Sequence, residues 1–394
     1  MNLRHHHPPD SWALILRGTW LSLLLLLLNT GCTITPHTTP FVIGLYGVDD
    51  TNTFREIRNL GVDIITGSSE VRFLDAAHRH GLRVFASLGT TAGLDFDPVQ
   101  ARRSILHADR HPALWAWYLI DEPDLNEIHP GLVEAASRFV KSTGSRKPVG
   151  VVLQHGGEAL NYARAADLLM IDRYPVAWQP LCVFENHVRL SRLGTAAGRP
   201  LYGIVQAFDW TYYKNLVPDE TALRPPTEQE MRCMSYGALV QGANGLFYFT
   251  FNSPPWDIRK HPETWSALKS VLTELNTRRG LFGAEHLWWP WKRSLVFQDP
   301  VRLNEVQESR VSLAWLRVGP GSRDVAPGEY VLALNNSGAP ANVRIHLPRR
   351  VTGTLPLLEG NESRTVEENW LRESFEPYGV RVYGPLPTST ASVR

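Results

Sequence analysis

The chain has 394 residues, with 40 Lys and Arg against 39 Asp and Glu and a formal net charge of +1. This balance excludes a polybasic nucleic-acid-binding protein and an acidic disordered tail, so we expect no nucleic-acid partner. Hydrophobic residues make up 43% of the chain, which allows a large core, and aromatic residues make up 10%. The aromatic residues indicate either that core or stacking platforms for flat or ring-shaped ligands.

The first 31 residues have the pattern of a secretory signal. Arg4 and Arg17 precede an apolar run over 21–28, which leads through Asn, Thr and Gly to Cys32. The run is far shorter than the roughly 20 residues of a membrane-spanning helix. The pattern resembles a bacterial lipoprotein signal, which implies a lipid on Cys32. We expect the mature chain, after a linker over 32–40, to be lipid-anchored to a membrane of a bacterial cell envelope, periplasmic or surface-exposed, with plain secretion and an uncleaved anchor as alternatives.

Eight short apolar segments follow and are predicted β-strands. Most are apolar along their whole length, which is typical of parallel strands that are buried on both faces. They cover 41–47, 62–66, 82–88, 114–120, 148–153, 167–171, 201–206 and 245–251.

Amphipathic segments alternate with these strands and predict helices. They cover 53–60, 70–80, 127–140, 183–193, 227–240 and 263–275. Gly61 and Gly81 end the first two helices, and Thr227 and Glu230 have capping-box spacing. The alternation predicts a (β/α)8 barrel over 41–282. A doubly wound sheet is the alternative, but no Gly-rich phosphate loop follows the first strand.

The pattern changes after residue 282. Short apolar or alternating segments lie between turns at 294–298, 310–318, 329–336, 341–348 and 380–386. They predict a small antiparallel, sandwich-like β domain over 283–387, followed by a tail over 388–394. Cys182 and Cys233 remain after Cys32, and either a disulfide or two buried thiols is open.

The fourth predicted strand ends in a run of acidic residues. It leads into Asp121-Glu122-Pro123-Asp124, and the active sites of (β/α)8 barrels lie where the strands end. Carboxylates beside a core are costly to desolvate. We expect Glu122 to point into the barrel mouth as a functional carboxylate, whereas Asp124 is expected to cap the next helix.

A hydrophobic fourth strand that ends in Glu-Pro resembles the acid/base strand of the clan A glycoside hydrolases. The resemblance covers about residues 41–280, and the trailing β domain is common in that clan. It implies a (β/α)8 barrel that cleaves glycosidic bonds, with Glu122 as general acid. Two positions depart from the clan's pattern: Asp121 stands where an Asn usually holds the sugar 2-hydroxyl, and Gln206 stands at the strand-seven nucleophile position. The segment from Arg224 into the eighth strand also resembles uncharacterised bacterial hydrolase-like barrels.

The amide at Gln206 is a poor nucleophile and leaves three explanations. Asp209 supplies the second catalytic carboxylate, or Asp172 supplies it from the end of the sixth strand, or the site binds glycans without cleaving them. The alternative role for Asp172 is a salt bridge with Arg173 or with a residue at the end of a neighbouring strand. A separation of about 5–5.5 Å between the two carboxyl groups would indicate a retaining enzyme, and about 6.5–9.5 Å an inverting one.

Further substrate-binding candidates are mostly aromatic residues near strand ends, because aromatic rings stack on the C–H faces of sugars. The candidates are Tyr46, Asp121, Gln154, His155, Tyr174, Gln206, Trp210, Phe249 and Trp256. His155 has no His or Cys at matching strand ends, so we expect no metal and no cofactor. The expected substrate is an oligo- or polysaccharide outside the cytoplasm. The alternative is a non-catalytic glycan-binding surface lipoprotein with a degenerate barrel, and a weaker third option is a barrel enzyme of other chemistry.

Overall fold

The structure is a computed structural model that describes residues 41–196, 198–217, 222–289, 292–296 and 311–387. The predicted signal, Cys32, the 32–40 linker and the 388–394 tail lie outside the described residues. Within the described ranges, no helix is both long enough and apolar enough to cross a membrane.

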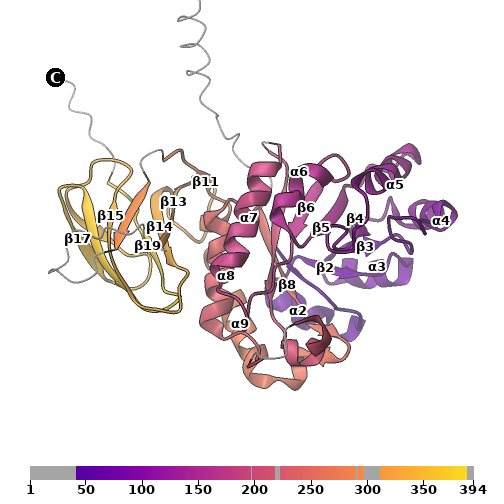
Figure 1. Ribbon diagram of the computed structural model, residues 1–394, viewed down its shortest axis with the longest axis horizontal. Helices are drawn as coiled ribbons and strands as arrows, with labels where there is room; N and C mark the ends of the chain where they lie inside the picture. Colours follow the sequence, from indigo (N-terminus) through magenta and orange to yellow (C-terminus); the bar gives the residue numbers. More distant parts are fainter. Residues whose placement is uncertain (1–40, 197, 218–221, 290–291, 297–310, 388–394) are drawn as a thin grey trace, which may run out of the picture. The chain divides into compact units, whose positions relative to one another are not determined.

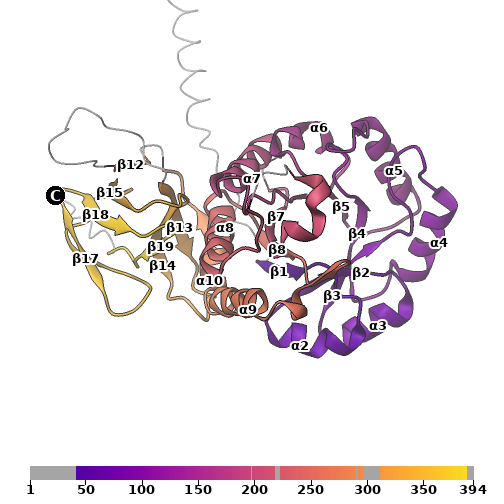
Figure 2. The same cartoon turned by 60° about the horizontal axis from the view of Figure 1, so that its bottom comes forward.

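The predicted (β/α)8 barrel is confirmed. Eight parallel strands pair in sequence order, and β8 pairs with β1 to close the barrel. Figure 2 shows the helices arranged around these strands. The strands are β1 Val42–Leu45, β2 Ile64–Gly67, β3 Arg83–Ser87, β4 Leu114–Ile120, β5 Val149–Leu153, β6 Leu168–Ile171, β7 Leu201–Gln206 and β8 Gly245–Phe249.

The connecting segments carry the helices labelled in Figure 1. The α-helices are α2 Phe54–Asn59, α3 Val71–Arg79, α4 Pro98–Ala108, α5 Pro130–Ser142, α6 Ala159–Tyr162, α7 Cys182–Gly194, α8 Glu228–Val240, α9 Pro262–Asn276 and α10 Arg279–Phe282. The 3-10 helices are η1 Thr51–Thr53, η2 Gly156–Glu158, η3 Trp210–Leu216 and η4 Ile258–Lys260. The capping box of α8 forms as its spacing predicts: Thr227 Oγ1 accepts from the Glu230 backbone N–H, and Glu230 Oε2 accepts from the Thr227 N–H. Both reciprocal bonds fix the start of this helix.

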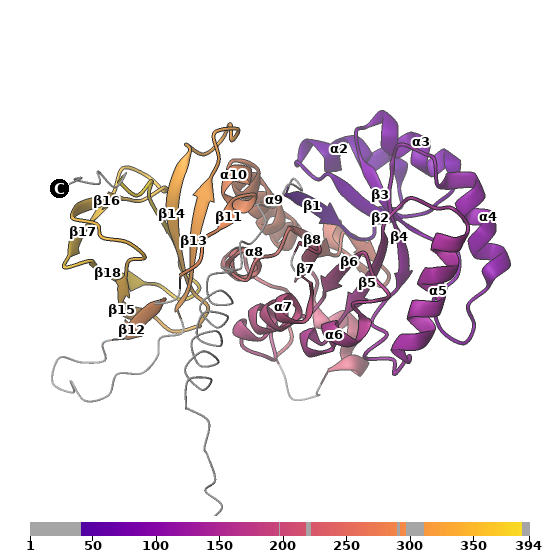
Figure 3. The same cartoon turned by 90° about the horizontal axis from the view of Figure 1, so that it is seen from above.

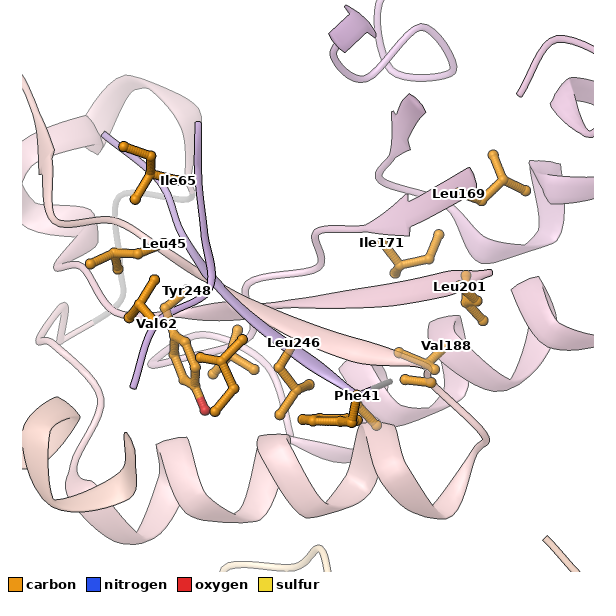
Figure 4. Close-up of a cluster of buried hydrophobic side chains, with 14 of the residues drawn as sticks. Phe41, Leu45, Val62, Ile65, Leu169, Ile171, Val188, Leu201, Leu246 and Tyr248 are labelled. Carbon is orange, nitrogen blue, oxygen red and sulfur yellow. The ribbon is translucent and has the colours of Figure 1, made fainter. Parts of the chain in front are cut away.

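Alternating strand residues form two separate apolar layers, because successive side chains of a strand point to opposite faces. The layer inside the barrel includes Val42, Ile64, Phe85, Met170, Tyr202 and Phe247. The layer between strands and helices includes Leu45, Ile65, Leu169, Ile171, Leu246 and Tyr248, shown in Figure 4. Gly44 faces the inner layer, where an added Cβ would lie 2.2 Å from the Phe247 ring. The barrel is therefore a packed core, and its mouth is left for the site.

Antiparallel sheets follow the barrel, as the sequence predicts. A four-stranded sheet has the order β11-β13-β14-β19 and a five-stranded sheet the order β12-β15-β18-β17-β16; Figure 3 shows β13 beside β14. The strands are β11 Glu285–His286, β12 Arg293–Val296, β13 Val311–Val318, β14 Gly328–Asn335, β15 Ala341–His346, β16 Gly353–Pro356, β17 Ser363–Glu367, β18 Trp370–Phe375 and β19 Val380–Tyr383. A further short pair, β9 Asn252–Ser253 and β10 Trp256–Asp257, lies in the loop after β8.

The two cysteines of the described chain are free thiols. Cys182 is half-buried at the start of α7, and Cys233 is buried in α8. Burial raises the pKa of the Cys233 thiol well above its ordinary value, because the thiolate would lose its hydration. This thiol therefore serves as a small apolar side chain of the core.

Candidate active site

A cavity of about 410 Å³ opens at the carboxyl ends of the barrel strands. Its wall combines seven aromatic side chains with three carboxyl groups and one guanidinium. The lining residues are Tyr46, Asp121, Glu122, Leu125, Gln154, Asp172, Arg173, Tyr174, Trp178, Phe208, Trp210, Tyr213, Leu216 and Phe249. Titratable groups in an apolar cavity at this end of a barrel mark a candidate active site.

Glu122 reaches the cavity from an unusual backbone conformation. Its φ is 43°, in the left-handed region that a residue with a side chain rarely adopts. The Glu122 N–H donates to Val152 O of β5 at 3.0 Å, and Glu122 O accepts from the N–H and Nδ2 of Asn126 at 3.0 and 2.8 Å. Regular strand geometry would point Asp121 and Glu122 to opposite faces. The left-handed turn instead lets both side chains line one cavity, and such strain is concentrated at functional sites.

Asp172 lies against Glu122. It follows β6, its N–H donates to Leu153 O at 3.2 Å, and only 5% of its surface is exposed. The carboxyl groups of Asp172 and Glu122 are hydrogen-bonded to each other, which requires that one of them carries a proton. Asp172 Oδ1 is buried and has no hydrogen-bond partner.

The surroundings of this carboxyl pair favour its protonated state. Burial first, and then the negative charge of Asp121, raise the pKa of Glu122 to about 7, although the hydrogen bond from Asp172 and the charge of Arg173 lower it. Burial also raises the pKa of Asp172 well above its ordinary value, and the charge of Glu122 acts in the same direction. Two hydrogen-bonded carboxyl groups titrate as one unit. The pair therefore keeps at least one proton at neutral pH.

Asp121 is the third carboxyl group of the cavity. It accepts a hydrogen bond from Tyr118 Oη at 2.6 Å, and the Tyr118 ring stacks on Phe85 at 4.5 Å inside the barrel. Desolvation in the cleft raises the pKa of Asp121, whereas this hydrogen bond lowers it. The net effect raises the pKa of Asp121, and the hydrogen bond from Tyr118 offsets part of that rise.

The strand-seven residue Gln206 does not line the cavity. It is fully buried, and its Nε2 donates to Val176 O at 2.6 Å and to Phe208 O at 3.2 Å. Its Oε1 accepts from the Val176 N–H at 2.9 Å. The amide therefore pins the loop after β6 to β7, a role that needs both a donor and an acceptor and that a carboxylate could not fill.

Asp209 also lies apart from the cavity lining. Its carboxylate caps η3 by accepting from the Thr211 N–H at 2.7 Å. Trp256 is fully buried and stacks on His261 at 4.0 Å. His155 is 48% exposed at its side chain and lies outside the lining. Of the three predicted catalytic carboxylates, Glu122 and Asp172 therefore lie together, and Asp209 lies apart from them.

The predicted helix cap at Asp124 is wrong. The Asp124 carboxylate accepts the backbone N–H groups of Gln154 and His155 at 3.2 and 2.6 Å, and α5 is capped by His129. Asp124 therefore ties the loop after β5 to the loop after β4. This connection spans 30 residues of sequence, so local spacing could not reveal it.

Arg173 is the main lining residue that the sequence analysis did not select as a site residue. Its Nη1 donates to Gln154 Oε1 at 3.0 Å, and its Nε donates to Gln179 Oε1 at 3.2 Å. The alternative salt bridge with Asp172 is not observed. The position of Arg173, directly after Asp172 at a strand end, is the signal that could have identified it. The lining is completed by Trp178, Phe208, Tyr213, Leu125 and Leu216. The two leucines come from loops that carry no comparable signal.

Candidate metal ligands do not converge: within the described ranges, no group of three or more His, Cys, Asp or Glu side chains is placed to hold a metal ion.

Comparison with known proteins gives no family model and no curated protein that match the chain.

The fold is similar to solved structures. One is an α-amylase from Geobacillus thermoleovorans complexed with acarbose, with a TM-score of 0.53, 10% identity, and coverage of 89% of this chain and 99% of that one. Another is a β-galactosidase from Bacillus circulans sp. alkalophilus, with a TM-score of 0.53, 9% identity, and coverage of 89% and 100%. The GH42 β-galactosidase Gan42B has a TM-score of 0.53, 9% identity, and coverage of 87% and 98%. At such identities the likeness establishes the shared fold, a barrel followed by β-sheets.

Proposed function

We propose that the protein hydrolyses glycosidic bonds of a glycan, with Glu122 as the general acid. The observation that carries this proposal is the hydrogen-bonded pair of Glu122 and Asp172, which holds a proton at neutral pH inside an aromatic cavity. A general acid works best when its pKa lies near the working pH. The solved structures with this fold include an amylase and β-galactosidases, which supports a glycan as the substrate of this chain.

The three carboxyl groups take different roles in this proposal. Glu122 is the more open member of the pair and donates its proton to the glycosidic oxygen as the bond to the anomeric carbon breaks. Asp172 is a positioning residue: its hydrogen bond stabilises the Glu122 carboxylate that remains. Asp121 faces the positive charge that develops on the sugar ring. Water then adds to the anomeric carbon, and its proton returns to Glu122.

The contact between Glu122 and Asp172 sets the role of Asp172. Hydrogen-bonded carboxyl groups lie closer together than the about 5–5.5 Å of retaining enzymes or the about 6.5–9.5 Å of inverting ones. Asp172 therefore acts through Glu122 and not from across the sugar. The aromatic wall, including Tyr174, Trp210 and Phe249, supplies the faces on which sugar rings stack.

The test compares Glu122→Gln with Glu127→Gln on a panel of polysaccharides, with released reducing ends as the readout. Glu127 is exposed, lies on the same loop and also has a left-handed φ, of 54°, so it is a matched control. We expect Glu122→Gln to lower turnover by about 10²–10⁴-fold and Glu127→Gln to retain it. Wild-type activity in Glu122→Gln would refute the proposal. Binding of glycans by a wild type that cleaves none of them would favour the glycan-binding alternative.

We also propose a lipid anchor on Cys32 in a bacterial cell envelope, which the signal pattern of residues 1–31 supports. The test is the distribution of the full chain and of Cys32→Ser between membrane and soluble fractions of a bacterial host. We expect the wild type in the membrane fraction and the variant outside it. Equal distribution of the two proteins would contradict the anchor.

A further inference from the structure

Arg173 presents a positive charge to the cavity and is held there by neutral groups. Its guanidinium donates to the side-chain oxygens of Gln154 and Gln179 at 3.0 and 3.2 Å. It also lies over the Trp178 ring, 5.5 Å from the ring centroid. These contacts use Nε and Nη1, and no described residue accepts a hydrogen bond from Nη2. The guanidinium is therefore oriented before any ligand arrives, with donors left for one.

Several half-buried arginines of the described ranges have carboxylate partners, whereas Arg192 donates to the carbonyls of Arg199 and Gly242 and to Asn244 Oδ1. Arg232 and Arg278 contact Glu274 at 2.7 and 2.6 Å, and Arg279 contacts Asp63 at 2.7 Å. Among the described residues, no carboxylate lies within the 4.0 Å of an ion pair from Arg173, and the charges of Asp172 and Glu122 act on it from a longer distance. Holding a charge away from water without a counter-ion in direct contact is costly. A cavity that keeps such a cation at its wall is suited to a ligand that supplies the missing anion.

We propose that the cavity takes a glycan that carries an anionic substituent, a carboxylate or a sulfate ester, and that Arg173 binds this substituent. The inference rests on the proposed function, because it names the substrate class of the same site. Arg173 follows Asp172 in the chain, so the substituent binds beside the carboxyl pair while the sugar ring lies against the aromatic wall. The planar fork of an arginine suits the paired oxygens of both anions.

The carboxyl groups of the cavity carry less than their full negative charge, because desolvation raises the pKa of Asp121 as well as those of the pair. Burial raises the pKa of Glu122 and of Asp172, so this pair carries less than its full negative charge near neutral pH. Trp178 covers part of the guanidinium and reduces its hydration, which strengthens its attraction to an anion.

The test is affinity electrophoresis of the full chain at 0.15 M salt, a concentration of about physiological ionic strength, in gels that contain matched polysaccharides. Polygalacturonate is compared with its methyl ester, which differs only at the carboxylate. Dextran sulfate is compared with dextran, which differs only at the sulfate. The proteins are the wild type, Arg173→Gln, Arg173→Lys and the control Arg138→Gln. Arg138 is a surface residue of α5 that is 67% exposed at its side chain.

We expect the wild type to bind the acidic member of at least one pair about tenfold or more tightly than its neutral member, the size of one charge-assisted contact. The pair that shows this difference identifies the anion. Arg173→Gln loses the preference, Arg173→Lys retains part of it, and Arg138→Gln keeps it. Equal binding within both pairs, or no binding of either acidic polymer, would overturn the proposal. So would a preference that survives in folded Arg173→Gln.

Failure of this inference can be distinguished from failure of the proposed function by running Glu122→Gln in the same gels. A preference for the acidic polymer in both wild type and Glu122→Gln, without hydrolysis by the wild type, supports the anion site and refutes the hydrolase. Hydrolysis of neutral glycans that is unchanged in Arg173→Gln supports the hydrolase and overturns the anion site.

Discussion

Replacing Glu122 with Gln should stabilise the fold at alkaline pH while removing activity. The pKa of Glu122 is raised from 4.5 to about 7, so between these values the folded state binds more protons than the unfolded state. The contribution of Glu122 to the stability of the wild type therefore falls as pH rises from 4.5 through 7. The shift corresponds to about 3.4 kcal/mol at about 1.36 kcal/mol per unit. Because Glu122 is partly open to solvent, screening reduces the expected effect to about 1–2 kcal/mol.

The assay is urea unfolding at pH 5 and at pH 8, followed by tryptophan fluorescence. We expect the free energy of unfolding of Glu122→Gln, relative to wild type, to be about 1–2 kcal/mol larger at pH 8 than at pH 5, because the amide does not ionise. Glu127→Gln makes the same substitution at an exposed residue outside the cavity and measures what the exchange does by itself. A relative stability that is equal at both pH values, or lower at pH 8, would refute the placement of Glu122 in a desolvated cavity.

Three further outcomes follow from the contacts described. Turnover by the wild type should decline above a pH of about 7, as Glu122 loses its proton, and a rate that stays flat to pH 9 would contradict this. Asp124→Ala should lower the free energy of unfolding by about 1–3 kcal/mol, because the N–H groups of Gln154 and His155 lose their acceptor; an unchanged urea midpoint argues against that anchor. Thr227→Ala removes the side-chain cap of α8 and should cost about 0.5–2 kcal/mol in the same assay, with no loss if the cap is dispensable.

The strands were predictable because their signal is local. β4 and β7 begin and end at the predicted residues, Leu114–Ile120 and Leu201–Gln206, since each is an uninterrupted apolar run between turn residues. Helix α4 was not predicted. Its Val99 and Leu106 are 68% and 74% exposed, so its apolar residues do not form the single buried stripe by which an amphipathic helix is recognised.

The candidate site was predictable in position but not in its connections. A strand end at the mouth of a barrel is enough to select Glu122 and Asp172. The hydrogen bond between them, however, joins residues 50 positions apart in the chain, and the sequence alone left Asp209 as an equal candidate. The left-handed backbone of Glu122 depends on β5 and on Asn126, which no local pattern shows.

By itself the sequence determined the barrel, the β-sheets that follow it and the strand end that carries the acidic residues, because hydrophobic periodicity and turn residues act over a few neighbours. Only the tertiary structure decided which polar groups meet. Gln206 lies behind the cavity lining, where it holds the loop after β6, and Asp124 is joined to the loop after β5. Arg173 lies at the cavity without a carboxylate of the described ranges in contact. Burial and pairing of charges depend on residues that are distant in sequence, and these determine the chemistry of the cavity.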